Sequence, residues 1–207
     1  MSEAMRALQE RVYVKPDGEF GPMTARAIQK YYDLTPERAA HLLGQASHES
    51  AGFKLTRENL NYSAAAMRRV WPSRFPTIES AAPFERRPAA LAEKVYGGRM
   101  GNVPDTNDAW MFAGKGFLQL TGRDNYRAFA ADMRAPEVLD DPDLVATSHY
   151  AMDTAYWYFE RNRLWSIADD GVNDDTIKRI TRKVNGGYHG LEDRTARTLE
   201  VYKWLTA

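Results

Sequence analysis

The sequence from Ser47 to Tyr62 reads SHESAGFKLTRENLNY and sets a glutamate where the surrounding pattern is apolar. Before it, small and apolar residues recur at the i, i+3, i+4, i+7 spacing of a helix with one buried face: Ala39, Leu42, Leu43 and Ala46. Glu49 continues that face, and Gly52 follows as a helix stop. A carboxyl group there is partly desolvated and lies at the negative end of the helix dipole, and both effects favour its protonated form. The pattern therefore predicts a general acid at Glu49.

A second glutamate, Glu58, follows in the polar segment 57–61. Neighbouring side chains that can hydrogen-bond are expected to keep Glu58 ionised, so that it can act as a base. Glycoside hydrolysis requires two carboxyl groups in contrasting environments: one protonates the leaving oxygen, and the other activates water or attacks carbon. Because the chain carries 28 acidic residues, this pair alone does not establish the chemistry.

The segment 114–126 reads GKGFLQLTGRDNY and places polar residues between apolar ones. Gln119 and Thr121 alternate with the apolar residues of this segment and are expected to line one surface. Trp110 lies shortly before the segment and is a better candidate for stacking on a sugar ring than Trp157 or Trp204, which fall within helical patterns.

Four segments of the chain, in this order, resemble the signature blocks of the family 19 glycoside hydrolases: 48–50, 58–62, 114–126 and 184–187. These are the chitinase-like enzymes, and the sequence is most similar to their short bacteriophage endolysin branch. Two departures stand out. Lys115 replaces the arginine that the family usually carries between the two glycines, which exchanges a forked donor for a point charge. The disulfides and extra loops of the plant chitinases are missing.

The resemblance implies a role for each matching residue. Glu49 is the general acid, Glu58 is the general base, and the Thr121 hydroxyl helps to hold the attacking water. The implied mechanism is a single displacement with inversion, which requires the two carboxyl groups to be roughly 6.5–9.5 Å apart. The resemblance implies that the remaining matching residues bind the substrate or belong to a polar cluster near the cleft: His48, Tyr62, Gln119, Asn125, Asn185, and either Arg194 or Arg197.

The expected fold is mostly α: a lysozyme-like, two-lobed helical domain with a minor short β element. We expect residues 1–207 to form a single catalytic domain, with a larger and a smaller lobe around a cleft. Segment 1–34 contains a stretch similar to the core motif of small peptidoglycan-binding modules, but it is short for such a module, and the pattern favours a turn and helix of the catalytic domain. Helices are predicted over 22–32, 36–49, 145–159, 177–184 and 195–205. Short β segments are predicted near 56–62 and 117–121, and loops over 71–88 and 97–109.

Composition limits the possible functions. The net charge is zero, which gives no electrostatic argument for nucleic-acid binding. The chain has no cysteine, so it has neither a disulfide nor a thiol nucleophile. His41 and His48 lie seven residues apart, without the spacing of a shared zinc site, and no metal or other cofactor is expected. Residues 1–6 lack the pattern of a signal peptide, and no apolar stretch is long enough to insert into a membrane.

The resemblance, with which the composition is compatible, implies a monomeric, bacteriolytic glycoside hydrolase that cuts β-1,4 bonds in the glycan strands of peptidoglycan. We expect it to be made in the cytoplasm of a host bacterium and to reach the cell wall after a holin has permeabilised the membrane. Two alternatives remain at this point: a chitinase acting on chitin oligomers, which would use the same catalytic residues, and a non-catalytic wall-binding phage component.

Overall fold

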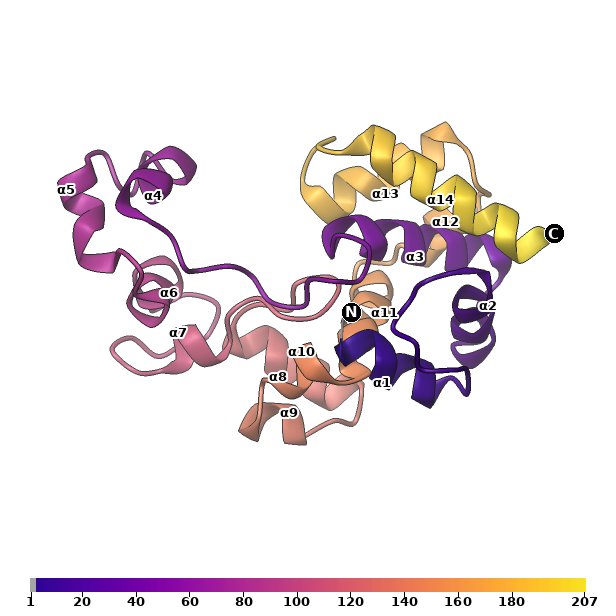
Figure 1. Ribbon diagram of the computed structural model, residues 1–207, viewed down its shortest axis with the longest axis horizontal. Helices are drawn as coiled ribbons and strands as arrows, with labels where there is room; N and C mark the ends of the chain where they lie inside the picture. Colours follow the sequence, from indigo (N-terminus) through magenta and orange to yellow (C-terminus); the bar gives the residue numbers. More distant parts are fainter. Residues whose placement is uncertain (1–2) are drawn as a thin grey trace. The chain divides into compact units, whose positions relative to one another are not determined.

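The computed structural model describes residues 3–207 and is mostly helical, which confirms the predicted fold class (Figure 1). Residues 1 and 2 lie outside the described residues. They belong to the segment 1–6, which was predicted to lack the pattern of a signal peptide. The chain forms two compact units. The first unit consists of residues 3–56, 116–119 and 143–207. The second unit consists of residues 57–115 and 120–142.

The first unit contains the longest helices, α3, α11, α13 and α14. Its helices are α1 (Glu3–Arg11), α2 (Pro22–Tyr31), α3 (Pro36–Glu49), α10 (Leu144–Thr147), α11 (Tyr150–Arg161), α12 (Trp165–Ala168), α13 (Asp174–Asn185) and α14 (Leu191–Thr206). Across the described chain, no helix combines the length and the apolar character that crossing a bilayer requires.

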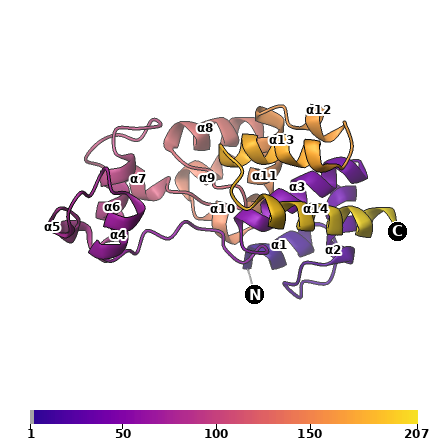
Figure 2. The same cartoon turned by 90° about the horizontal axis from the view of Figure 1, so that it is seen from above.

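Helix α3 lies in the core of the first unit, with α14 packed along it (Figures 1 and 2). The two backbones approach closely at Gly44, where a Cβ atom would lie 2.8 Å from Thr198 Cα. Helices α1 and α2 bury Leu8 and Ile28 in the same core. The segment 3–34 therefore packs with α3 as part of the first unit.

The prediction of one continuous helix over 145–159 is wrong. The apolar spacing runs through this stretch, but the structure has two helices, α10 and α11, with a break at Ser148 and His149. The Ser148 hydroxyl donates to the carbonyl of Leu144 (2.6 Å) and accepts from the amide of Tyr150 (3.2 Å). A serine side chain that bonds nearby backbone groups in this way competes with helix continuation.

The second unit has shorter helices around its own apolar core, which includes Met67, Phe75 and Leu91. The segment 71–88, predicted to be a loop, contains α5 and η1, while the loop predicted over 97–109 ends where α7 begins. The helices of this unit are α4 (Ala64–Val70), α5 (Ile78–Ala81), η1 (Ala82–Phe84), α6 (Pro88–Tyr96), α7 (Asp108–Met111), α8 (Arg123–Asp132) and α9 (Glu137–Asp140).

Extended structure is minimal. Within residues 3–207 there is no β-strand, and the short β segments expected near 56–62 and 117–121 reduce to two isolated antiparallel bridges in the second unit, Arg57 with Lys115 and Lys115 with Leu120. In the second bridge, the amide of each residue donates to the carbonyl of the other, at 3.1 and 2.7 Å. These bridges fix the chain on both sides of residues 116–119.

Candidate active site

Glu49 is the last residue of α3, as predicted. Thr35 caps the start of the helix by accepting a hydrogen bond from the Arg38 amide (3.3 Å), and Pro36 occupies the first turn. The small and apolar residues that precede Glu49 on the predicted stripe are fully buried: Ala39, Leu42, Leu43 and Ala46. The Glu49 side chain is 25% exposed, so it lies at the edge of the buried face.

A buried arginine is the charged partner of Glu49. Arg194 is 1% exposed, and its Nη2 donates to Glu49 Oε1. Its Nη1 donates to Gln45 Oε1 (2.6 Å) and its Nε donates to the His189 carbonyl (3.1 Å). An arginine side chain stays protonated in a protein, so a buried guanidinium requires such partners. The end of α3 and the start of α14 are therefore joined by an ion pair.

The second predicted arginine, Arg197, belongs to a neighbouring network that fixes His48. Asp193 Oδ2 lies 2.6 Å from both Arg197 Nε and His48 Nδ1, and Arg197 Nη1 donates to Ser47 Oγ (2.8 Å). Arg197 first, and His48 second, lower the pKa of Asp193. A Cβ at Gly190, whose φ is +70°, would lie 2.3 Å from the His48 ring. His48 is thus held from two sides, beside the residue predicted to be the acid.

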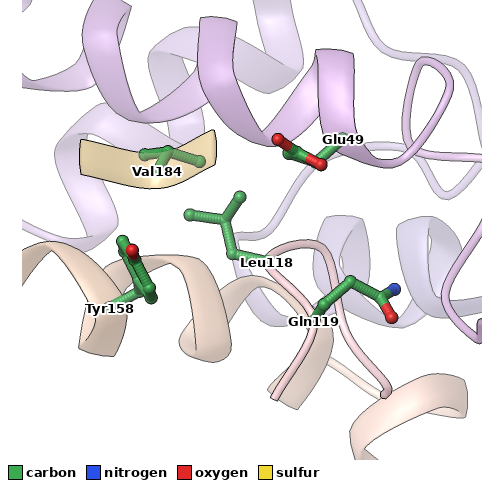
Figure 3. A pocket seen from close by; sticks show the side chains of 5 residues that line it. All are labelled: Glu49, Leu118, Gln119, Tyr158 and Val184. Atoms are coloured by element: carbon green, nitrogen blue, oxygen red, sulfur yellow. The ribbon is translucent and has the colours of Figure 1, made fainter. Parts of the chain in front are cut away.

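A pocket of about 110 Å³ opens beside Glu49 in the first unit (Figure 3). Figure 3 shows Leu118 pointing from its loop toward the side where Glu49 and Val184 lie. The Tyr158 hydroxyl donates to the carbonyl of Lys183 (2.9 Å), and burial together with the charge of Glu49 raises the pKa of Tyr158. The pocket is lined by Glu49, Leu118, Gln119, Tyr158 and Val184. It therefore combines a carboxylate and an amide with apolar walls, a combination suited to a ligand that is partly polar and partly apolar.

The loop that carries Leu118 and Gln119 is anchored on α11. The Phe117 amide donates to the Ala151 carbonyl (2.9 Å), and Gly116, with φ +86°, leaves no room for a side chain because a Cβ would lie 2.4 Å from Thr154 Oγ1. Gln119 has a φ of +22° and is exposed. This anchoring explains why a glycine is needed at position 116.

Glu58 lies in the second unit and is held by main-chain and side-chain hydrogen bonds. Its amide donates to the Gly114 carbonyl (2.9 Å), and the Gly114 amide donates in return to Glu58 Oε1 (2.7 Å). The Tyr96 hydroxyl donates to Glu58 Oε2 (2.9 Å). The hydrogen-bonding surroundings expected for Glu58 are present, but Tyr96 was not predicted to supply them.

Thr121 and Asn125 lie together in the second unit. Gly122, with a φ of +87°, is the N-cap residue before α8, and Asn125 Nδ2 in the first turn donates to the Thr121 carbonyl (2.8 Å). Lys115 is 5% exposed, and its Nζ donates to the Met111 carbonyl (2.6 Å). The lysine that departs from the family pattern is therefore bonded to the protein's own backbone.

The other predicted binding residues occupy separate positions. Tyr62 packs against Trp71, with ring centroids 5.1 Å apart, and Trp110 is 42% exposed on α7. Asn185 ends α13 on the surface of the first unit, where Gly186, at φ +76°, caps the helix. The roles of these three side chains in substrate binding remain predictions.

Among residues 3–207, no group of three or more histidine, cysteine, aspartate or glutamate side chains is arranged to hold a metal ion. The titratable groups at the site are instead hydrogen-bonded to arginine, tyrosine or backbone partners. Sequence reasoning missed Tyr96, Asp193 and Gln45 as members of these networks. Tyr96 and Gln45 bond residues that are distant along the chain, so the sequence around them carries no signal, whereas the i, i+4 spacing of Asp193 and Arg197 was a signal that could have found Asp193.

Comparison with known proteins identifies a relative. A protein of Haemophilus influenzae described as a glycosyl hydrolase family 19 domain-containing protein is 32% identical to this chain over 172 residues, which is 81% of the chain and 80% of the relative. No family model matches the chain. The relative confirms the resemblance that the four sequence blocks indicated.

Proposed function

Because the chain belongs to glycosyl hydrolase family 19, we propose that it cleaves the β-1,4 bonds of bacterial peptidoglycan as an endolysin-type enzyme. As a member of the family it is a glycoside hydrolase. The observation that carries the proposed acid catalysis is the place of Glu49: a carboxyl group at the edge of the core, beside a pocket with apolar walls and paired with a buried guanidinium.

In the proposed reaction Glu49 is the general acid. Its proton passes to the glycosidic oxygen as the bond from that oxygen to the anomeric carbon breaks. Glu49 then carries a negative charge, and the Arg194 guanidinium beside it stabilises that charge as it develops. Because Arg194 already pairs with Glu49 in the free enzyme, the proposed cycle requires Glu49 to take up a proton before the glycosidic bond breaks.

Glu58 is the proposed general base. It accepts a proton from a water molecule whose oxygen bonds to the anomeric carbon on the face opposite the leaving group, which inverts the configuration. The Thr121 hydroxyl is proposed to help orient that water. His48, Tyr62, Trp110, Gln119, Asn125, Asn185 and Arg197 are proposed to bind or frame the sugar chain.

The choice of peptidoglycan over chitin rests on the resemblance of the four sequence blocks to those of the short phage endolysins. The chain also contains no cysteine, so it lacks the disulfides of the plant chitinases. The two polymers share N-acetylated sugars joined by β-1,4 bonds, so the same acid and base would serve either one. We propose that the protein works as a monomer on single glycan strands.

Digestion of the two polymers tests the substrate. Purified peptidoglycan and chitin oligomers are incubated with the enzyme, and the products are reduced and analysed by mass spectrometry. We expect new reducing ends from peptidoglycan, and α-anomers as the first products in an NMR time course, because inversion converts a β-linkage into an α-hydroxyl. A higher kcat/KM on chitin would instead assign the chitinase activity, and β-anomers would exclude inversion.

The proposed site of action is the bacterial cell wall, reached from the cytoplasm once a holin has opened the membrane. When the protein is expressed alone in a Gram-negative cell, we expect culture turbidity to stay stable and to fall rapidly only after chloroform is added. An inactive Glu49→Gln protein expressed at the same level is the control for lysis by chloroform itself. Spontaneous lysis before chloroform would contradict the proposed route.

A further inference from the structure

Glu58 is hydrogen-bonded at both of its carboxylate oxygens. Oε1 accepts from the Gly114 amide at 2.7 Å, and Oε2 accepts from the Tyr96 hydroxyl at 2.9 Å. A carboxylate offers about four lone-pair sites, so each oxygen keeps capacity for a further partner. Two donors on opposite oxygens fix the rotation of the carboxylate plane, which a single donor would leave free.

The backbone that carries Tyr96 is itself held in place. Tyr96 ends α6, its carbonyl accepts a hydrogen bond from Asn102 Nδ2 (3.1 Å), and the preceding carbonyl of Val95 accepts from Arg74 and Arg99, both at 3.1 Å. Val95 is 5% exposed and packs in the core of the second unit. The hydroxyl of Tyr96 therefore has a defined position relative to Glu58.

The Tyr96 hydroxyl remains a donor at neutral pH. Burial, followed by the nearby Glu58 carboxylate, raises the pKa of Tyr96 well above its ordinary value, and the charges of Arg74 and Arg99 oppose this shift. A tyrosine that stays protonated offers its proton to the carboxylate across the working pH range. The hydroxyl can therefore donate to the Glu58 carboxylate at neutral pH.

We propose that Tyr96 is the positioning residue of the general base, holding Glu58 in the orientation that receives the proton of the attacking water. This inference rests on the proposed function, in which Glu58 is that base. The Tyr96 proton stays on its own oxygen throughout. The water proton goes to a free lone pair of Glu58, while the water oxygen bonds to the anomeric carbon and the leaving oxygen takes the proton of Glu49.

The hydrogen bond has a second consequence for the pH dependence of the reaction. Donation to a carboxylate favours its ionised form, so removing the hydroxyl makes the base easier to protonate. The variant that lacks the hydroxyl should therefore lose activity at a higher pH than the wild type as the solution is acidified. A tyrosine that served only to pack the core would leave this limb of the profile unchanged.

The test is Tyr96→Phe, assayed on peptidoglycan fragments as a function of pH. We expect kcat to fall about tenfold, with KM within about twofold of the wild type, because the lost bond acts on the base rather than on the sugar. The acid limb of the kcat profile should move to higher pH. Tyr202→Phe is the matched control, because it removes a tyrosine hydroxyl that donates to Glu37 at 3.1 Å in the first unit; its activity should equal that of the wild type.

A second variant keeps the hydroxyl and the size of the side chain. Replacing Tyr96 with 3-fluorotyrosine by amber suppression makes the hydroxyl more acidic and therefore a stronger donor, so the acid limb should move to lower pH. This protein decides the question if Tyr96→Phe fails to fold. An unchanged acid limb in the fluorinated enzyme would overturn the positioning role.

The outcomes also separate this inference from the proposed function. If the wild type cuts neither polymer, or if Glu58→Gln retains full activity, the function or the base assignment fails and the positioning role falls with it. If the wild type is active and Glu58→Gln is inactive while Tyr96→Phe keeps the wild-type kcat and pH profile, only the positioning role is wrong. A raised KM at constant kcat would instead place Tyr96 in sugar binding.

Discussion

Glu49→Gln is expected to fold like the wild type and to lose on the order of 10²–10⁴-fold in kcat, the contribution of a positioned proton donor. The glutamine side chain has nearly the same size, and its amide oxygen still accepts the hydrogen bond of Arg194. Its amide group has no proton that it can give to the leaving oxygen. The measurement is kcat on peptidoglycan fragments together with a thermal unfolding curve.

Two controls separate chemistry from stability. Glu200→Gln changes an exposed glutamate on α14, and it should leave both kcat and the unfolding curve unchanged. Glu49→Ala removes the acceptor as well as the acid, so it should lower the free energy of unfolding more than Glu49→Gln does. A Glu49→Gln enzyme within a few-fold of wild-type kcat would remove Glu49 from the role of acid.

The helix ends that depend on adjacent residues were predictable from the sequence. Thr35 and Pro36 begin α3, and Gly186 ends α13, because capping and left-handed backbone are local properties. The break between α10 and α11 was not predictable from apolar spacing, since that spacing continues across it. The Ser148 side chain competes there for the backbone hydrogen bonds.

The site was predictable in part, for a similar reason. The apolar stripe of α3 placed Glu49 at the edge of the core, and the structure has it there. The resemblance left the arginine of the polar cluster near the cleft undecided between Arg194 and Arg197, which lie three residues apart on α14. The packing of α14 on α3 buries the first of them, and its pairing with Glu49 was not predicted. Tyr96 lies 38 residues from Glu58 in sequence, so only the tertiary fold could bring it to the carboxylate.

Replacing Arg194 with methionine is expected to lower both stability and activity. The free energy of unfolding should fall by about 2–3 kcal/mol, because Gln45 and Glu49 lose a buried charged donor. The loss is smaller than the ~3–5 kcal/mol of a fully buried pair because the Glu49 side chain is 25% exposed and can be rehydrated. Turnover should fall on the order of 10²-fold, since the charge that develops on the acid loses its stabilising partner.

A double-mutant cycle with Glu49→Gln isolates the ion pair. In the Glu49→Gln background Arg194→Met leaves no carboxylate unpaired, so its cost in unfolding free energy should be smaller by about 1 kcal/mol or more. Arg179→Met is the matched control, because Arg179 is 46% exposed and pairs with the exposed Asp170 and Asp175; it should leave the free energy of unfolding nearly unchanged in both backgrounds. Equal costs of Arg194→Met in both backgrounds would show that the arginine stabilises the fold through Gln45 and the His189 carbonyl alone. The guanidinium would then have no energetic link to the acid, and the fall in turnover would have to come from a displaced α14.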